Sequence, residues 1–298
     1  MEEKILIIDF GSQYTQLIAR RIRELNVYCE IHPFNSLPKL HNKISGIVLS
    51  GSPYSVNDND APNFDFLKFS DIPILGICYG AQLIAKKFHC EISQSSSREY
   101  GRAKLSNIKK SKILNNIKID STVWMSHGDS ITNISSNLEI ISSTNDVNVA
   151  AYEVKDHKIY GLQFHPEVTH TTNGTKILKN FISDICGCKG SWTPKKFIDS
   201  SIIEIKNKLK NDKVLLGLSG GVDSSVVAFL INRAVGNNLV CVFVDNGLLR
   251  KNEFENVLKS YQNLGLNVIG VNAKKKFYAS LKGKVDPEDK RKAIGKTF

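Results

Sequence analysis

The feature that most constrains this chain is a repeated alternation of short apolar runs with longer segments of helical periodicity. Apolar runs of strand length lie at residues 5–10, 27–31, 46–49 and 72–77. Apolar residues at helical spacing follow at 14–25 and 79–88. Strands that alternate with helices are typical of a parallel α/β sheet. Residues 91–164 are richer in strand patterns and turns, with strands predicted at 121–125, 138–143, 147–154 and 159–164. This predicts a mixed or antiparallel extension, closed by a helix at 174–185.

A second α/β pattern begins after residues 187–194 (GCKGSWTP), which read as a linker because they contain two glycines and a proline. Helices are predicted at 197–209, 223–235 and 253–264, and strands at 214–218, 239–244 and 268–271. We therefore predict an α/β protein of two domains, as a length of 298 residues allows. Residues 1–190 would form an open mixed sheet and residues 191–298 a doubly wound parallel sheet. The second pattern stops in a polar, helix-like stretch, so we expect that domain to be incomplete.

The positive charge is concentrated in the last third of the chain. The formal net charge is +11; residues 1–190 carry 21 Lys+Arg against 19 Asp+Glu, and residues 191–298 carry 19 against 10. A basic surface attracts phosphates and nucleotides. We expect no nucleic-acid binding, because the sequence has no RNP, helix-turn-helix or zinc-finger pattern.

The cysteines and the N-terminus indicate in which cellular compartment the protein is expected. Six cysteines are spread along the chain, and the short apolar run at residues 5–8 cannot serve as a signal-peptide core. The six cysteines are therefore expected to be reduced thiols. No apolar run approaches the roughly 18 residues of a membrane span. We expect a soluble, cytoplasmic protein without membrane contact.

Residues 76–80 (GICYG) follow a predicted strand and open a predicted helix. This is the form of a nucleophile elbow with Cys78 in place of serine. Glycines on either side permit a tight turn, and a helix N-terminus favours the thiolate that acts as nucleophile. The sequence therefore predicts that Cys78 is a catalytic nucleophile.

A thiol nucleophile needs a base and a group that orients the base. His165 and Glu167 follow the strand predicted at 159–164, and residues two apart in an extended chain point the same way. We predict that His165 is the base and that Glu167 holds its imidazole. An oxyanion hole is also required. Its predicted donors are the N–H of Tyr79 and the loop containing Gly51 and Ser52, although that loop could equally be a plain turn.

Residues 218–225 (LSGGVDSS) also join a predicted strand to a helix. Glycine N–H groups and a helix N-terminus favour an anion, and serine hydroxyls add donors. A carboxylate there contacts a phosphate only through a cation, so Mg²⁺ at Asp223 is predicted. The predicted ATP-binding residues are Ser219, Gly220, Gly221, Val222, Asp223, Ser224 and Ser225.

These motifs together resemble the class I (triad) glutamine amidotransferases, and the loop at 219–225 resembles the pyrophosphate loop of the ATP pyrophosphatase class. Further segments are similar to the glutamine-hydrolysing GMP synthase family: 9–14 (DFGSQY), 124–129 (WMSHGD), 163–170 (QFHPEVTH), 245–250 (DNGLLR), 286–288 (DPE) and 290–298 (KRKAIGKTF). That family extends well beyond 298 residues, so the resemblance implies a C-terminally truncated chain.

The resemblance implies a carbon–nitrogen ligase. Ammonia from glutamine would aminate XMP to GMP, with ATP and Mg²⁺ consumed and AMP and pyrophosphate released. The whole enzyme would be a homodimer through the absent C-terminal domain, and this chain alone would only hydrolyse glutamine. The residues implied to hold glutamine are Gln82, Ser126, His127, Gly128 and Asp129. The family usually has glycine at position 52, and serine is less free than glycine to turn its N–H inward.

Three alternatives stay open at the level of sequence. A stand-alone γ-glutamyl hydrolase would share the triad but has no use for residues 219–225. A non-catalytic nucleotide-binding scaffold would not need an intact triad. A different amidotransferase–ligase fusion would be expected to differ at residues 124–129 and 163–170.

Overall fold

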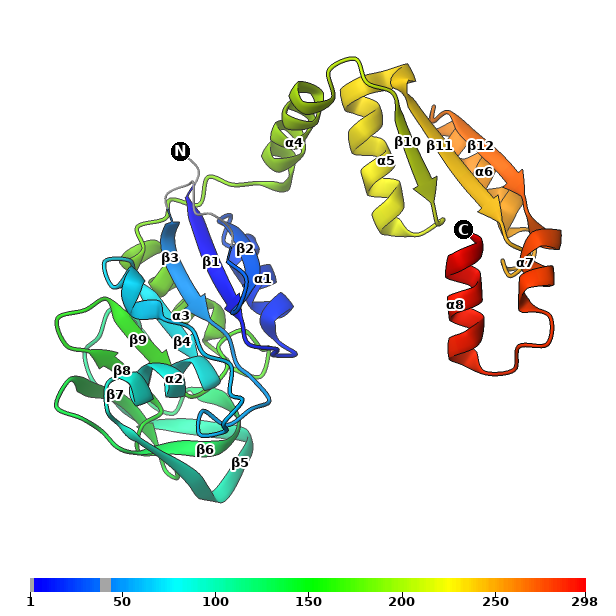
Figure 1. The fold of residues 1–298 in the computed structure, drawn as a ribbon. Coiled ribbons are helices and arrows are strands. Elements are labelled where there is room, and N and C mark those ends of the chain that lie inside the picture. Colours follow the sequence, from blue (N-terminus) through cyan, green and yellow to red (C-terminus); the bar gives the residue numbers. More distant parts are fainter. Residues whose placement is uncertain (1–2, 38–43) are drawn as a thin grey trace. The chain divides into compact units, whose positions relative to one another are not determined.

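The computed structural model describes residues 3–37 and 44–298, without the side chains of 95–99. The chain forms two compact units, 1–193 and 194–298 (Figure 1). Within the described residues, every helix is too short or too polar to cross a bilayer.

The first unit is built on a mixed sheet, in which the described strands follow the order β2-β1-β3-β4-β9-β8-β7-β5-β6. Five neighbouring strands run parallel to one another: β2, β1, β3, β4 and β9. The other neighbouring pairs, β9-β8, β8-β7, β7-β5 and β5-β6, are antiparallel. The strands are β1 (Lys4–Asp9), β2 (Tyr28–Pro33), β3 (Ile44–Leu49), β4 (Ile74–Ile77), β5 (Glu91–Ile108), β6 (Thr122–Asn133), β7 (Leu138–Thr144), β8 (Ala151–Val154) and β9 (Ile159–Leu162). The predicted mixed α/β fold is confirmed.

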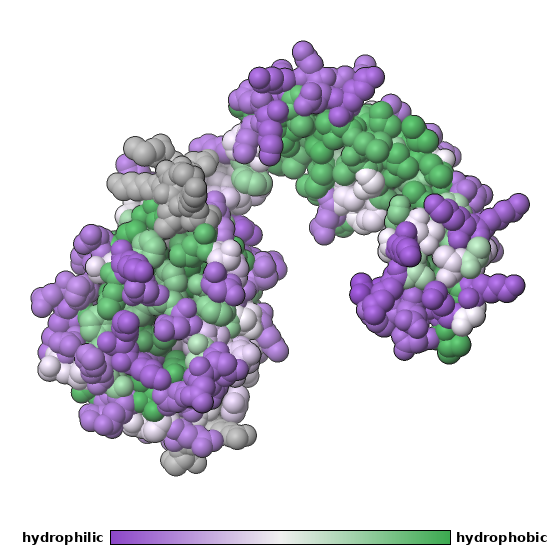
Figure 2. All heavy atoms as spheres, viewed as in Figure 1, coloured by the Kyte–Doolittle hydropathy of each residue, from purple (hydrophilic) through white to green (hydrophobic). Residues whose placement is uncertain are grey.

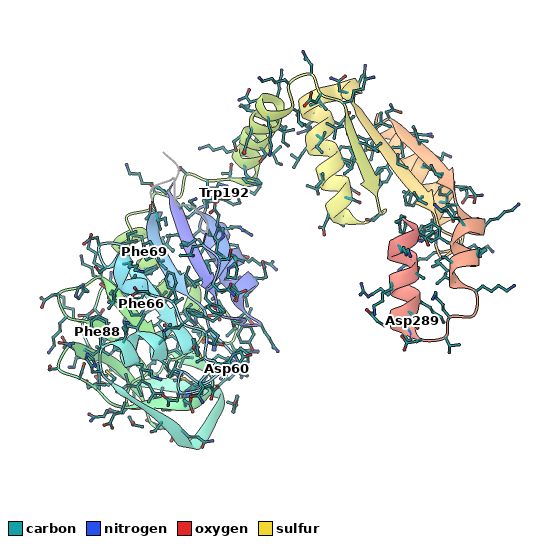
Figure 3. All side chains as sticks on the ribbon, in the orientation of Figure 1. Asp60, Phe66, Phe69, Phe88, Trp192 and Asp289 are labelled. Carbon is teal, nitrogen blue, oxygen red and sulfur yellow. The ribbon has the colours of Figure 1, made fainter. Side chains whose placement is uncertain are left out.

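Helices cover both faces of this sheet, which explains why its parallel strands are apolar throughout. The helices are α1 (Thr15–Glu24), η1 (Phe66–Phe69), α2 (Tyr79–Lys87) and α3 (Gly174–Lys179), which continues as a π-helical turn, η2 (Asn180–Ile185). Ile5 and Ile7 of β1 pack in a core with α1 and α3. Leu6 and Ile8 of the same strand pack in a second core with α2. Phe66 and Phe69 of η1 are labelled in Figure 3.

Several elements of the first unit differ from the sequence prediction. β5 spans Glu91–Ile108, a serine-containing stretch whose individual strand the pattern did not predict. Its identity as a strand comes from long-range antiparallel pairing with β6, which local periodicity does not encode. The strand predicted at 147–154 begins only at Ala151. The strand predicted at 121–125 extends to Asn133, and the strand predicted at 159–164 ends at Leu162.

The second unit contains a parallel sheet of the described strands in the order β10-β11-β12. Its elements are α4 (Pro194–Leu209), β10 (Val214–Leu218), α5 (Val222–Val235), η3 (Gly236–Asn238), β11 (Leu239–Asp245), α6 (Glu253–Asn263), β12 (Val268–Asn272), α7 (Lys274–Leu281) and α8 (Pro287–Thr297). The carboxylate of Asp286 caps α8 by accepting from the N–H groups of Glu288 and Asp289, the latter labelled in Figure 3.

Helices α5 and α6 pack on the same face of this sheet, against Leu218, Cys241 and Phe243. The side chains on the opposite face include Leu215 and Ile269, which are 74% and 50% exposed. Figure 2 shows hydrophobic surface gathered over this unit. The described part of the second unit is therefore a sheet with one helical layer in contact with its core.

Candidate active site

Cys78 occupies a sharp turn between β4 and α2. Its backbone has φ +52° and ψ −107°, a region that side-chain-bearing residues rarely adopt. Non-glycine residues in such conformations cluster at functional sites, and each costs about 1–3 kcal/mol. The sulfur thus lies at the N-terminus of α2, where the helix dipole favours negative charge.

Two close backbone contacts explain the glycines of the elbow. A Cβ on Gly76 would lie 2.6 Å from the carbonyl oxygen of Gly80, and a Cβ on Gly80 would overlap the carbonyl oxygen of Leu49. The N–H of Gly80 also donates to the carbonyl of Ser50 at 3.0 Å. Side chains at positions 76 and 80 would force α2 away from strands β3 and β4.

Strand pairing brings His165 to this turn from 87 residues further along the chain. Ile77 at the end of β4 is in register with Leu162 at the end of β9, and the N–H of Cys78 donates to the Leu162 carbonyl at 2.8 Å. The carboxyl ends of neighbouring parallel strands meet at one edge of a sheet, which is where ligands bind in this architecture. Cys78 and His165 therefore line one cavity of about 410 Å³.

His165 and Glu167 form a buried pair. The imidazole Nδ1 lies 2.7 Å from Glu167 Oε1, and the two residues are 3% and 0% exposed. The N–H of His165 donates to the Trp124 carbonyl at 3.0 Å, and its own carbonyl accepts from Thr171 Oγ1 at 2.6 Å. These two backbone bonds fix the histidine from both sides.

The surroundings of the imidazole favour its protonated form. Burial lowers the pKa of His165, but the charge of Glu167 and the charge and hydrogen bond of Cys78 outweigh it, so the pKa lies well above its ordinary value. The Cys78 sulfur also lies 3.6 Å from the Ser126 carbonyl and 3.9 Å from Gln163 Nε2. The structure thus brings Cys78, His165 and Glu167 together, with the imidazole in contact with both the sulfur and the carboxylate.

The loop at 50–53 passes beside the imidazole. A Cβ on Gly51 would lie 3.5 Å from His165 Cε1 and 3.2 Å from Ser12 Oγ, so a larger residue would crowd the histidine. Ser52 turns its hydroxyl away and donates to the Phe10 carbonyl at 2.8 Å. Its φ is not positive, so this position does not demand glycine. The effect of serine on how the N–H at position 52 turns toward the cavity stays a prediction.

All five residues implied to hold glutamine line the same cavity: Gln82, Ser126, His127, Gly128 and Asp129. Gln82 Nε2 donates to the Asp129 carbonyl at 2.7 Å and to Gln163 Oε1 at 3.1 Å. His127 Nδ1 lies 2.8 Å from the same carbonyl, and burial lowers the pKa of His127. Ser55 Oγ donates to the Asp129 carboxylate. Gln82 and His127 thus brace the wall that carries Asp129.

Two side chains beside the pair were not predicted as site residues, although their segments entered the resemblance. The Tyr14 ring packs edge-on against the His165 imidazole, with centroids 5.0 Å apart at 70°. Gln163 links Gln82 to the Cys78 sulfur. The alternation along a strand could have indicated Gln163, because it lies two residues before His165. Nothing local could have indicated Tyr14.

In the second unit, residues 219–225 form an exposed loop at the start of α5. Gly220 has φ +78°, a conformation that favours glycine, and Gly221 precedes the helix. Ser224 Oγ lies 3.0 Å from Ser219 Oγ and donates to the Gly221 carbonyl at 3.1 Å. Ser225 Oγ makes the same bond at 2.7 Å. The hydroxyls thus shape the loop and leave the N-terminus of α5 open to solvent.

Asp223 lies exposed in the first turn of α5. Within 3–37 and 44–298, no group of three or more His, Cys, Asp or Glu side chains could hold a metal by itself. Mg²⁺ in nucleotide sites takes one or two carboxylates together with substrate phosphates and water. One carboxylate at the start of α5 fits Mg²⁺ that arrives with a nucleotide.

A family model described as "Glutamine amidotransferase class-I" matches residues 6–185, and the chain belongs to this family. A model described as "NAD synthase" matches residues 195–296.

Among curated proteins, the chain is similar to glutamine-hydrolyzing GMP synthases. It is 60% identical over 300 residues to that of Cytophaga hutchinsonii and 55% identical over 300 residues to one from Bacteroides thetaiotaomicron. Both alignments cover 100% of this chain and 59% of the relative, so the chain spans less than two thirds of these proteins. The crystal structure of a protein from Thermoplasma acidophilum, described as belonging to a GMP synthase, is 33% identical, with a TM-score of 0.56, over 63% of this chain and 95% of that one.

Proposed function

We propose that the first unit hydrolyses glutamine to glutamate and ammonia through Cys78, His165 and Glu167. The observation that supports this most strongly is the backbone-strained Cys78 in one cavity with a buried histidine–carboxylate pair. The Cys78 sulfur attacks the side-chain amide carbon of glutamine and forms a tetrahedral intermediate. Its collapse breaks the carbon–nitrogen bond, and water then resolves the thioester to glutamate and the free thiol.

His165 serves both halves of this reaction. Its raised pKa favours an imidazolium that stabilises the Cys78 thiolate and then donates its proton to the departing ammonia. In the second half it takes a proton from the attacking water. Glu167 keeps the ring oriented and supports its positive charge.

Developing negative charge on the amide oxygen needs donors that are already in place. The Tyr79 N–H is one, because the first residues of a helix have no preceding turn to receive their N–H groups. The loop of Gly51 and Ser52 supplies the other, since the Ser52 hydroxyl anchors that loop to Phe10. The polar wall of Gln82, His127 and Asp129 would receive the glutamine head group.

We infer for the second unit a phosphate site at residues 219–225 that takes ATP. In the whole protein, ATP would adenylate XMP there, and ammonia from the first unit would displace AMP to give GMP. Asp223 would hold Mg²⁺ bound to the nucleotide, and the ion would neutralise phosphate charge. Similarity to GMP synthases over all of this chain supports the assignment.

The 298-residue chain is expected to release glutamate from glutamine but to form no GMP from XMP, ATP and glutamine. The whole protein is expected to form GMP. The measurement is enzymatic detection of glutamate and chromatographic detection of GMP, with and without ATP and Mg²⁺. GMP formed by the 298-residue chain would contradict the prediction that this chain only hydrolyses glutamine. A whole protein unable to make GMP would contradict the synthase assignment.

ATP binding by this chain is expected to depend on Mg²⁺ and on Asp223. Asp223→Asn removes the carboxylate and should weaken Mg-ATP binding roughly tenfold, the equivalent of one charge-assisted contact. Titration calorimetry with and without EDTA measures this, and Glu255→Gln in the first turn of α6 is the matched control. Equal affinities for parent chain and Asp223→Asn would refute the role of Asp223.

A further inference from the structure

Only one oxygen of the Glu167 carboxylate has a hydrogen-bond partner among the described residues. Oε1 bonds to His165, whereas Oε2 is buried and has no hydrogen-bond partner among the described residues. A buried oxygen without a partner contributes nothing to fixing the side chain. The position of this carboxylate therefore depends on the backbone that carries it.

The side chain of Arg21 ties that backbone to α1. Arg21 Nε donates to the Glu167 carbonyl at 3.0 Å, across 146 residues of sequence. Its Nη1 pairs with Glu24 at 2.7 Å, and its side chain is only 19% exposed. Because Glu24 already holds one side of the planar guanidinium, Arg21 loses little further freedom when it donates to the Glu167 carbonyl.

The same helix reaches the other member of the pair. Tyr14, seven residues before Arg21, caps α1 and packs against His165. Residues seven apart lie on one face of a helix, two turns from each other. One face of α1 thus contacts both the imidazole and the backbone of Glu167.

We propose that Arg21 is a positioning residue for glutamine hydrolysis: it fixes the Glu167 backbone so that the carboxylate stays on His165 Nδ1. The inference rests on the proposed function of the first unit. Arg21 does not line the cavity and acts only through Glu167.

A pH profile separates positioning from general support of the fold. The groups that face His165 are Glu167, Cys78 at the N-cap of α2, His127 from β6 and the Tyr14 ring. Of these, Glu167 and Cys78 raise its pKa. If Glu167 shifts, it raises the pKa of His165 less, so the Cys78–His165 pair is lost at lower pH. Simple destabilisation would lower all rates without moving the profile.

The experiment measures the rate of Cys78 alkylation by iodoacetamide against pH, read by mass spectrometry of the peptide that contains Cys78, together with glutamate release. Arg21→Met removes the donor. It is expected to move the alkaline limb of the pH profile to lower pH by about one unit, the equivalent of one weakened charge-assisted hydrogen bond. Arg21→Lys retains a donor and should therefore show a smaller shift than Arg21→Met. Arg20→Met is the matched control, because Arg20 also pairs with Glu24 but is 73% exposed.

The outcomes separate the two proposals. A parent chain whose Cys78 reacts with the pH dependence of an unpaired thiol contradicts the proposed function, and the inference with it. A paired Cys78 whose profile is the same in Arg21→Met and Arg20→Met overturns the inference alone. A shift in Arg21→Met that Arg21→Lys reduces and Arg20→Met lacks supports it.

Discussion

Glutamate release is expected to vanish in Cys78→Ala, by roughly 10⁴-fold or more, because the variant has no atom that can form the thioester. The fold should persist, since the substitution removes a single sulfur atom and leaves Cβ in place. The measurement is glutamate release over hours with circular dichroism as the check on folding. Cys186→Ala is the matched control, because burial raises the pKa of that thiol and it lies outside the cavity.

Retained glutamate release in Cys78→Ala would refute the proposed chemistry. Cys78→Gly tests the backbone strain separately, because it also lacks the sulfur but adopts φ +52° with less cost. It should exceed Cys78→Ala in unfolding free energy by about 1–2 kcal/mol. Both tryptophans, Trp124 and Trp192, lie in the first unit, so urea titration of tryptophan fluorescence reports its unfolding. Equal midpoints for the two variants would show that Cys78 is unstrained.

Glu167→Gln is expected to lower kcat for glutamine hydrolysis by roughly 10²–10⁴-fold, because an amide neither fixes the imidazole tautomer nor stabilises its charge. The alkaline limb of the pH profile should also move to lower pH, since Glu167 is a principal cause of the raised pKa of His165. Steady-state kinetics across the neutral and alkaline range measures both effects. Glu153→Gln, whose carboxylate bonds to Ser111 instead, is the control and should change neither.

The same substitution predicts the sign of a stability change with pH. A histidine with a raised pKa in the folded state stabilises the fold fully below its unfolded value, and this contribution is lost as pH rises through the folded pKa. Glu167→Gln should therefore cost most stability at and below the ordinary pKa of 6.5 and progressively less at alkaline pH. A difference in stability that grows with pH would contradict the pairing of Glu167 with a protonated His165.

Local patterns allowed much of the candidate site to be predicted. The elbow at 76–80 is a contiguous motif whose glycines have a local steric reason, and His165 and Glu167 lie two residues apart just beyond the end of β9. The loop at 219–225 is likewise a strand–turn–helix pattern within one stretch of chain. Short-range geometry is readable because backbone sterics act between neighbouring residues.

Other features depended on contacts between distant segments. The Ser52 hydroxyl bonds to the carbonyl of Phe10, 42 residues away. The role inferred for Arg21 depends on a bond across 146 residues. No periodicity or motif predicts which carbonyl the side chain of an arginine on a helix will reach.

The sequence by itself determined which groups could do chemistry, because the chemical nature of Cys78, His165 and Glu167 and their local turns follow from the residues and their neighbours. Only the tertiary structure decided that these groups meet. The pairing of β4 with β9 sets Cys78 beside the strand end that carries His165, and helix α1 closes on that pair from a third segment. The physical reason is that burial and strand pairing are collective: each contact is stable only when the whole sheet has formed, so no single stretch of sequence specifies it.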